Sequence, residues 1–146
     1  MKSEPESFSI DDLRARKREP WDGVRNFQAR NYMWKQMVVG DRVFFYHSNC
    51  KVPGVVGLAK VASKPYPDPS QFVATSKYYD PDSLGAAPRW WLVDVAFVKK
   101  FRRVVSLDEL RTHAEELTGM ALLQKGSRLS VQPVSDEHAE FIVGLV

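Results

Sequence analysis

Three runs of β-branched and aromatic residues most constrain the fold of this chain. Two of them, residues 42–47 and 55–61, are separated by a turn signal at Pro53-Gly54. The third run covers residues 89–101. Residues of these types favour strands, and Gly and Pro favour the turns between them. We therefore predict two neighbouring strands and, after an irregular surface excursion over residues 64–88, a third one.

The third run alternates in a way that assigns its side chains to two faces. Trp91, Val93, Val95 and Phe97 share one face, and Trp90, Leu92, Asp94 and Ala96 share the other. Successive side chains of a strand point to opposite faces. Because both faces are fairly apolar, we predict a central strand, with Trp91 in the core and Trp90 as the better candidate for contact with a ligand.

Four helices are predicted from N-cap residues that precede apolar residues at helical spacing. Their N-caps are Ser9, Asn26, Ser106 and Ser135, and they cover residues 10–18, 27–37, 107–117 and the C-terminal segment from residue 136. A further strand is predicted at residues 128–133. Short strands with helices inserted between them indicate an α+β chain built on a small mixed β-barrel, since a doubly wound sheet needs regular alternation of strand and helix.

Length and composition limit the class of protein. A chain of 146 residues fits a single domain with one substantial core. No apolar run approaches the roughly 20 residues of a membrane span, so we expect no membrane association. The single cysteine, Cys50, forms no internal disulfide and suits a reducing compartment, so we expect a cytoplasmic monomer, or a nuclear one in a eukaryote. The net charge of +3 permits phosphate binding without requiring it.

Enzyme and metal signatures are weak. No glycine-rich phosphate loop is present, and His47, His113, His138 and Cys50 lack the spacing of metal ligands. Cys50 and His47 have no third group that would orient them as a nucleophile and base. We therefore expect no metal or cofactor and no catalytic residue.

Aromatic and hydrogen-bonding residues are the chemistry that remains. They gather at Trp21, at residues 46–49 and at Trp90-Trp91. A pocket for one nucleobase needs aromatic faces beside the ring and donors and acceptors at its edge. Candidate contacts to phosphate are Arg14, Lys17 and Arg18 on the first helix and Lys99 and Lys100 after the third run, although each cluster alone also fits a solvated surface. Trp34 fits packing or an exposed position better than a ligand contact.

Eight segments of the chain resemble the EVE domain family in sequence and in order. They are residues 2–13, 21–31, 40–49, 54–59, 66–69, 79–81, 88–95 and 128–134. The resemblance covers essentially the whole chain and implies one EVE domain over residues 1–146. The implied fold is PUA-like, a mixed β-barrel with flanking helices, related to the YTH domains that read methylated adenine in RNA.

The resemblance also implies a binding pocket. In the wider group a Lys-Ser pair on the first strand is followed by a cage tryptophan, and Lys2, Ser3 and Trp21 stand in those places. The same pocket would include Arg25 and Asn26, would be lined by Tyr46, His47, Ser48 and Asn49, and would be closed by Trp90 or Trp91. Family members usually carry a few apolar and aromatic residues before the Lys-Ser pair, so we expect either that this sequence starts late within the first strand or that the first strand is short.

The leading hypothesis is a non-enzymatic module that reads a modified base, such as a methylated cytosine or adenine in DNA or RNA, by stacking it in an aromatic cage. One alternative is an enzyme acting on a nucleotide or RNA, with His47 or Asp22 as acid or base. Another is a barrel that binds a small molecule or a protein and whose tryptophans are structural.

Overall fold

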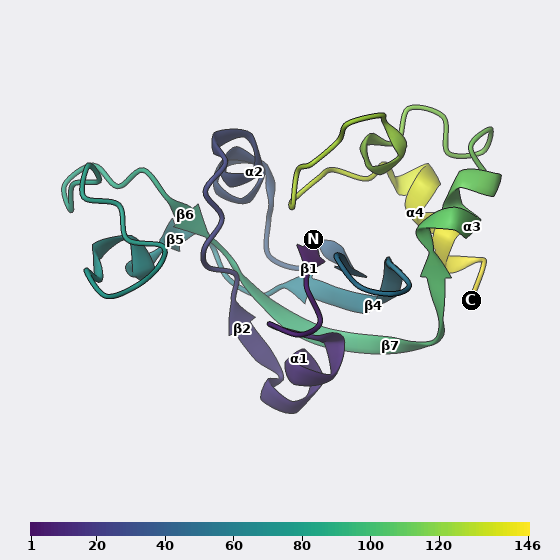
Figure 1. The fold of residues 1–146 in the computed structure, drawn as a ribbon, viewed down its shortest axis with the longest axis horizontal. Coiled ribbons are helices and arrows are strands. Elements are labelled where there is room, and N and C mark those ends of the chain that lie inside the picture. The colour runs from purple at the N-terminus through teal and green to yellow at the C-terminus, as the bar shows by residue number, and fades with distance from the viewer.

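A curled sheet of five strands is the centre of the structure, a computed structural model that describes residues 1–146 (Figure 1). The strand order is β1-β3-β4-β7-β2. The strands are β1 (Lys2–Ser3), β2 (Arg18–Pro20), β3 (Arg42–His47), β4 (Gly54–Val61) and β7 (Asp94–Ser106). β1 runs parallel to β3 and every other pair is antiparallel, so the sheet is mixed. The predicted α+β class and small mixed barrel are confirmed, in the form of a sheet curled into half a barrel.

The two neighbouring strands predicted from the sequence are confirmed as the antiparallel pair β3 and β4. β7 pairs with β4 on one side and with β2 on the other, so the predicted central position of the third run is also confirmed. The register of β4 against β7 shifts between Val55 and Gly57 and again between Leu58 and Ala59. Irregularities of this kind bend a strand and increase its twist, which fits the curl of the sheet.

The prediction of one continuous strand over residues 89–101 is wrong. Trp91–Leu92 form β6, which pairs with β5 (Tyr66–Pro67) in a separate two-stranded sheet, and β7 begins only at Asp94. The alternation of side chains therefore does not continue through Val93. The predicted burial of the two tryptophans is consequently reversed, because Trp90 is buried with 7% of its surface exposed and Trp91 is half-buried.

All four predicted N-caps are present. The side chains of Ser9, Asn26, Ser106 and Ser135 each accept a hydrogen bond from the backbone N–H three residues on. They begin α1 (Ile10–Arg16), α2 (Phe27–Asn31), α3 (Leu107–Thr112) and α4 (Asp136–Val143). None of these helices has the length and hydropathy of a membrane span.

The ends of the predicted elements are less accurate than their starts. α1 ends at Arg16 because Lys17 takes a positive φ of 69°, and Arg18 already belongs to β2. α2 continues as a π-helix, η1 (Tyr32–Gln36), and α3 stops at Thr112, before the predicted end. Residues 128–133 are not a strand: the only backbone hydrogen bond that joins them to the sheet runs from the Lys2 N–H to the Ser130 oxygen, at 2.8 Å.

Two apolar clusters fill the molecule. The larger one lies between the sheet, α1 and α2 and contains Leu13, Trp21, Met33 and Phe45. The smaller one packs the far ends of β4 and β7 against α3 and α4. The short 3₁₀-helix η3 (Ala121–Leu123) adds Leu122 and Leu123 to the edge of this second cluster.

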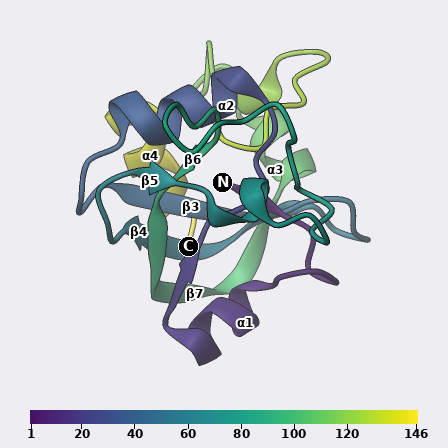
Figure 2. The ribbon, with the colours of Figure 1, turned by 90° about the vertical axis from the view of Figure 1, so that its left-hand side faces the viewer.

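The irregular excursion over residues 64–88 is confirmed and forms a folded loop, here called the 64–88 loop, at one end of the molecule (Figure 1). Seen from that side, the loop runs between α2 above and α1 below (Figure 2). It contains β5 and the 3₁₀-helix η2 (Pro69–Phe72). The fully buried Gln71 holds it together: its amide group donates to the carbonyl oxygens of Asp68 and Trp90, both at 2.8 Å, and accepts from the Ser83 hydroxyl at 2.5 Å.

Candidate functional site

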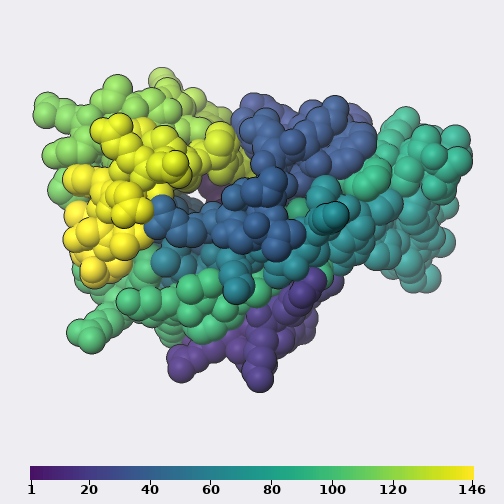
Figure 3. Space-filling model, turned by 180° about the vertical axis from the view of Figure 1, so that it is seen from behind, coloured from purple at the N-terminus to yellow at the C-terminus, as the bar shows by residue number.

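A cavity of about 630 Å³ lies where β1, the end of β2, the segment Trp21–Asn26 and the 64–88 loop meet. Five of the predicted ligand-binding residues line it, namely Lys2, Ser3, Trp21, Arg25 and Asn26. A second cavity of about 320 Å³, between β3, η1 and the segment before α4, includes none of the predicted residues. From behind, the molecule is hollowed between the α2–η1 segment and the C-terminal region, where that second cavity lies (Figure 3). The larger cavity is therefore the candidate site.

Trp21 forms a rigid wall of this cavity. Its ring packs edge-on against Phe45, with centroids 5.6 Å apart, and against Phe8 at 6.4 Å, which leaves 8% of the residue exposed. Its backbone N–H donates to the Val93 oxygen at 3.0 Å. The indole N–H bonds to no protein group. Every buried side-chain nitrogen in the structure has a hydrogen-bond partner, so this N–H is not buried and is open to a ligand.

An ion pair between Arg25 and Asp68 fixes the cavity wall. Arg25 Nη1 lies 3.0 Å from Asp68 Oδ2, and the other guanidinium nitrogens donate to Ser70 Oγ and to the Tyr78 carbonyl oxygen. The backbone N–H of Gly23 donates to the same Asp68 oxygen at 2.9 Å. Because the Arg25 donors are used inside the protein, Arg25 is a positioning residue that ties the segment Trp21–Asn26 to the 64–88 loop.

Hydrogen bonds keep Asp68 ionised despite its burial. Burial raises the pKa of this carboxyl, but the bonds from Ser70, Gly23 and Arg25 outweigh that effect and leave the pKa below its usual value. The charge therefore helps to hold the wall in place at neutral pH.

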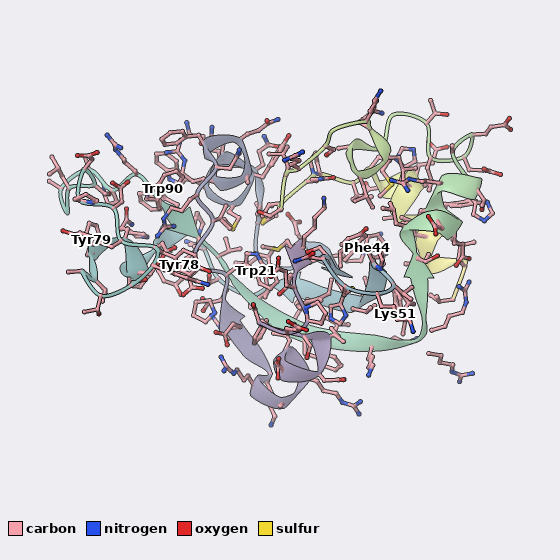
Figure 4. The ribbon with its side chains drawn as sticks, in the orientation of Figure 1. Trp21, Phe44, Lys51, Tyr78, Tyr79 and Trp90 are labelled. Atoms are coloured by element: carbon pink, nitrogen blue, oxygen red, sulfur yellow. The ribbon has the colours of Figure 1, made fainter.

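Tyr78 supplies a second aromatic side of the cavity. Gly23 has a φ of +79°, and a Cβ at that position would lie 2.5 Å from the Tyr78 ring. The tyrosine ring therefore packs directly on the glycine, and Figure 4 shows it beside Trp21 at the base of the 64–88 loop. The sequence predicts that Tyr78 lies in a loop with functional potential, but no pattern in it indicates that Tyr78 lines the same cavity as Trp21.

Polar groups at the rim retain free hydrogen-bonding capacity. Ser3 donates its hydroxyl proton to the Phe8 oxygen at 2.6 Å, which leaves the Ser3 oxygen as an acceptor. The Asn26 side-chain oxygen caps α2, which leaves the amide NH₂ as a donor. Asp22 adds a carboxyl whose pKa is raised by partial desolvation and by the nearby Asp68 and Glu19 charges. Burial lowers the pKa of Lys2.

The residues at the end of β3 lie outside the cavity, contrary to the implied pocket. His47 Nε2 accepts the Ile10 N–H at 3.1 Å and thereby holds the start of α1, and burial lowers the pKa of its ring. Ser48 donates its backbone N–H to the backbone carbonyl oxygen of Ser3, and the Asn49 amide donates to the Glu4 carboxylate at 3.0 Å. Tyr46 faces a separate small cavity of about 40 Å³. Tyr46 and His47 pair with β1 in the sheet, and Ser48 and Asn49 bond to Ser3 and Glu4.

Trp90 and Trp91 also lie outside the cavity. The Trp90 indole N–H donates to Asp80 at 2.7 Å, and that of Trp91 donates to the Pro88 oxygen at 3.1 Å. Their rings stack on Phe27 and Trp34. Unlike Trp21, both indoles have their hydrogen-bonding needs met within the fold.

The predicted phosphate contacts are likewise away from the cavity. Arg18 pairs with Asp94 at 2.9 Å and Lys100 pairs with Asp11 at 2.9 Å. Arg14, Lys17 and Lys99 are exposed but do not line the cavity. The basic residues that do line it, besides Lys2 and Arg25, are Arg16 and Lys77, which the sequence did not single out. No cluster of three His, Cys, Asp or Glu side chains offers a metal site.

Comparison with protein families gives a match over nearly the full chain. The family model described as the EVE domain matches residues 1–145. Thymocyte nuclear protein 1 of Mus musculus is 46% identical over 162 residues, which cover 99% of this chain and 71% of the relative. The Homo sapiens protein of the same name is 44% identical, covering 99% of this chain and 72% of the relative.

Solved structures share the same fold. A Pseudomonas putida protein superposes with a TM-score of 0.95 at 46% identity, covering 99% of this chain and 96% of the other. Human THYN1 protein in complex with 5-methylcytosine containing DNA superposes with a TM-score of 0.93 at 42% identity, covering 99% and 94%.

Proposed function

We propose that this chain, which belongs to the EVE domain family, binds DNA that carries a modified base and holds that base in the cavity beside Trp21. The observation that carries the proposal is the cavity itself, where a fixed indole offers an unpartnered N–H. The similarity to the human THYN1 protein, whose structure contains 5-methylcytosine DNA, supports 5-methylcytosine as the first base to test.

The size and lining of the cavity suit one base removed from a duplex. Its volume of about 630 Å³ lies within the roughly 300 to 1,000 Å³ of sites for small organic ligands. Removing a base from the stack costs a few kcal/mol, and stacking on an aromatic side chain returns about 1 to 3 kcal/mol. Favourable binding therefore also requires hydrogen bonds to the base edge, and the polar groups at the rim of the cavity can make them.

The rim groups match the edge of a cytosine. A carboxylate is the acceptor that recognises the exocyclic amino group of cytosine, and Asp22 lies at the rim. The Trp21 N–H and the Asn26 amide are donors for the carbonyl oxygen and ring nitrogen of the same base. Tyr78 and Phe8 supply apolar surface that suits a methyl group.

One observation favours a second candidate, an enzyme that acts on the bound nucleotide. The raised pKa of Asp22 is a property of general acids and bases. His47, the other predicted acid or base, has its Nε2 lone pair occupied by the Ile10 N–H and does not line the cavity. We favour a non-enzymatic reader because desolvation and the neighbouring Asp68 and Glu19 charges account for the raised pKa of Asp22 without a catalytic role. Mass spectrometry of the DNA after incubation tests the enzyme: a changed nucleotide mass that Asp22→Asn abolishes would establish turnover.

The proposed base reading is tested by measuring the affinity of the protein for two duplexes that differ by a single 5-methyl group on cytosine. Wild-type protein is expected to bind the methylated duplex more tightly. Trp21→Phe keeps a smaller aromatic ring and removes the N–H, so it should weaken binding of the methylated duplex by about 0.5 to 1.5 kcal/mol. Trp91→Phe makes the same chemical change outside the cavity and should leave the affinity ratio unchanged. Equal affinity of the wild type for both duplexes would refute the proposal.

A further inference from the structure

Two stacked aromatic pairs form a surface beside the cavity, on α2 and η1. Phe27 stacks on Trp90 with centroids 4.7 Å apart and planes 15° apart. Trp34 stacks on Trp91 at 4.8 Å and 7°. The side chain of Arg30 lies between the pairs, with its guanidinium carbon 4.6 Å from the Phe27 ring centre and 5.2 Å from that of Trp34. We call Phe27, Arg30, Trp34 and Lys35 the α2–η1 platform.

Phe27 and Lys35 of the platform are exposed, Arg30 and Trp34 are half-buried, and the two cations have no counter-ions. Phe27 is 51% exposed although Trp90 covers one side of its ring. Arg30 donates only to uncharged oxygens, those of the Asn31 side chain and the Arg89 backbone. Lys35 Nζ lies 4.9 Å from the Trp34 ring centre and makes no ion pair. An exposed aromatic ring beside two unneutralised cations is complementary to a nucleic-acid strand, which offers bases and phosphates together.

The platform continues directly from the cavity. Asn26 lines the cavity and Phe27 is the next residue. Arg25, which fixes the cavity wall, also lies 5.2 Å from the centre of the Trp90 ring on which Phe27 stacks. Figure 4 shows Trp90 between the 64–88 loop and α2, on the side of the molecule where Tyr78 lies. A strand that leaves the cavity past Asn26 therefore meets the platform first.

We propose that the α2–η1 platform binds the DNA strand next to the nucleotide held in the cavity. A neighbouring base stacks on Phe27, and Arg30 with Lys35 neutralises the adjoining phosphate. This inference rests on the proposed function, because it names the part of the DNA that lies outside the cavity. The platform contributes affinity for any sequence, and the cavity contributes the preference for the modified base.

The test uses the methylated and unmethylated duplexes with variants of exposed platform residues. Phe27→Ala is expected to weaken binding of both duplexes by about tenfold, which is about 1.4 kcal/mol, and to leave their affinity ratio unchanged. Phe27→Trp retains a stacking face and should restore the affinity. Lys35→Ala should reduce the slope of log affinity against log salt by about 1. Lys51→Ala is the matched control, because Figure 4 shows Lys51 far from Trp90, at the other end of the sheet.

The outcomes separate this inference from the proposed function. Unchanged DNA affinity in Phe27→Ala would overturn the platform and point to a protein partner for that surface. A lower affinity ratio in Phe27→Ala would also overturn it, since Phe27 would then act within base recognition. If the wild type binds the methylated and unmethylated duplexes with equal affinity, the proposed function is refuted. This result differs from the two results that overturn the platform, because those are measured on the Phe27 variant.

Discussion

Replacing Asp68 by asparagine tests whether the Arg25–Asp68 pair holds the site together. The carboxylate accepts four hydrogen bonds, two on each oxygen: Gly23 N–H and Arg25 Nη1 bond to Oδ2, and the Ser70 N–H and hydroxyl bond to Oδ1. Asp68→Asn keeps the shape of the side chain. One oxygen becomes an NH₂ donor, which faces either the Gly23 and Arg25 donors or the Ser70 N–H, depending on which way the amide is turned.

The magnitude follows from the burial of the pair. The Asp68 side chain is 2% exposed and that of Arg25 is 21% exposed. Breaking a buried ion pair from one side costs about 3 to 5 kcal/mol because the remaining charge is left unpaired. Arg25 keeps its bonds to Ser70 and Tyr78 and some contact with water, so we expect the lower end, about 3 kcal/mol.

Urea unfolding measures this loss, and a surface pair provides the control. Glu140→Gln removes the partner of Arg42, at 2.7 Å in a pair whose side chains are 50% and 67% exposed, and should cost less than about 1 kcal/mol. Asp68→Asn should also lower the preference for methylated DNA, because the segment that carries Trp21 is released. If Asp68→Asn unfolds at the same urea concentration as Glu140→Gln, the pair does not hold the site and the reasoning fails.

Three further predictions concern stability. Gly23→Ala should lower the free energy of unfolding by more than Gly119→Ala. Both glycines have a positive φ, but only at Gly23 would a Cβ collide with a side chain, the ring of Tyr78. Equal losses of stability in urea unfolding would contradict this contact. Trp90→Ala should lose about 3 to 5 kcal/mol as a buried aromatic, and a loss below about 1 kcal/mol would show that the indole is not core. The pKa of Asp68 is lower in the folded state than its ordinary value of 3.8. Ionised Asp68 therefore stabilises the fold above pH 3.8, and this contribution is lost as the pH falls through the lower pKa of the folded state. Unfolding measured against pH should show this acid loss in the wild type, and Asp68→Asn should show less of it.

The starts of the helices were predictable because their causes are local. Ser9, Asn26, Ser106 and Ser135 each bond to a backbone group three residues away, so the sequence alone contains both partners. The strand over residues 89–101 was not predictable in full because its break has a distant cause. Gln71 holds the backbone of Trp90, and β5 pairs with β6, so tertiary contacts override the alternation of side chains.

The candidate site was predictable in part, and the division has a physical reason. The wall residues Ser3, Trp21 and Asn26 lie in segments that resemble the family motifs, and all three line the cavity. Tyr78 and Lys77 belong to the 64–88 loop, which the bonds of Arg25 to Asp68, Ser70 and Tyr78 tie to the cavity wall. No spacing rule in the sequence relates residues on two sides of such a contact.

The hydrogen bond of each indole N–H distinguishes the tryptophans better than burial does. Trp21 and Trp90 are almost equally buried, at 8% and 7% exposed. Burial alone would assign both to the core, yet the Trp90 N–H is taken by Asp80 whereas the Trp21 N–H has no partner and lines a cavity. Because the Trp21 N–H is not buried, water can satisfy it in the free protein, and a ligand can take the place of that water. The fold therefore uses Trp90 to support the platform and leaves the Trp21 N–H available to a ligand, so Trp21→Phe should weaken recognition in addition to the stability that the smaller ring costs in the core.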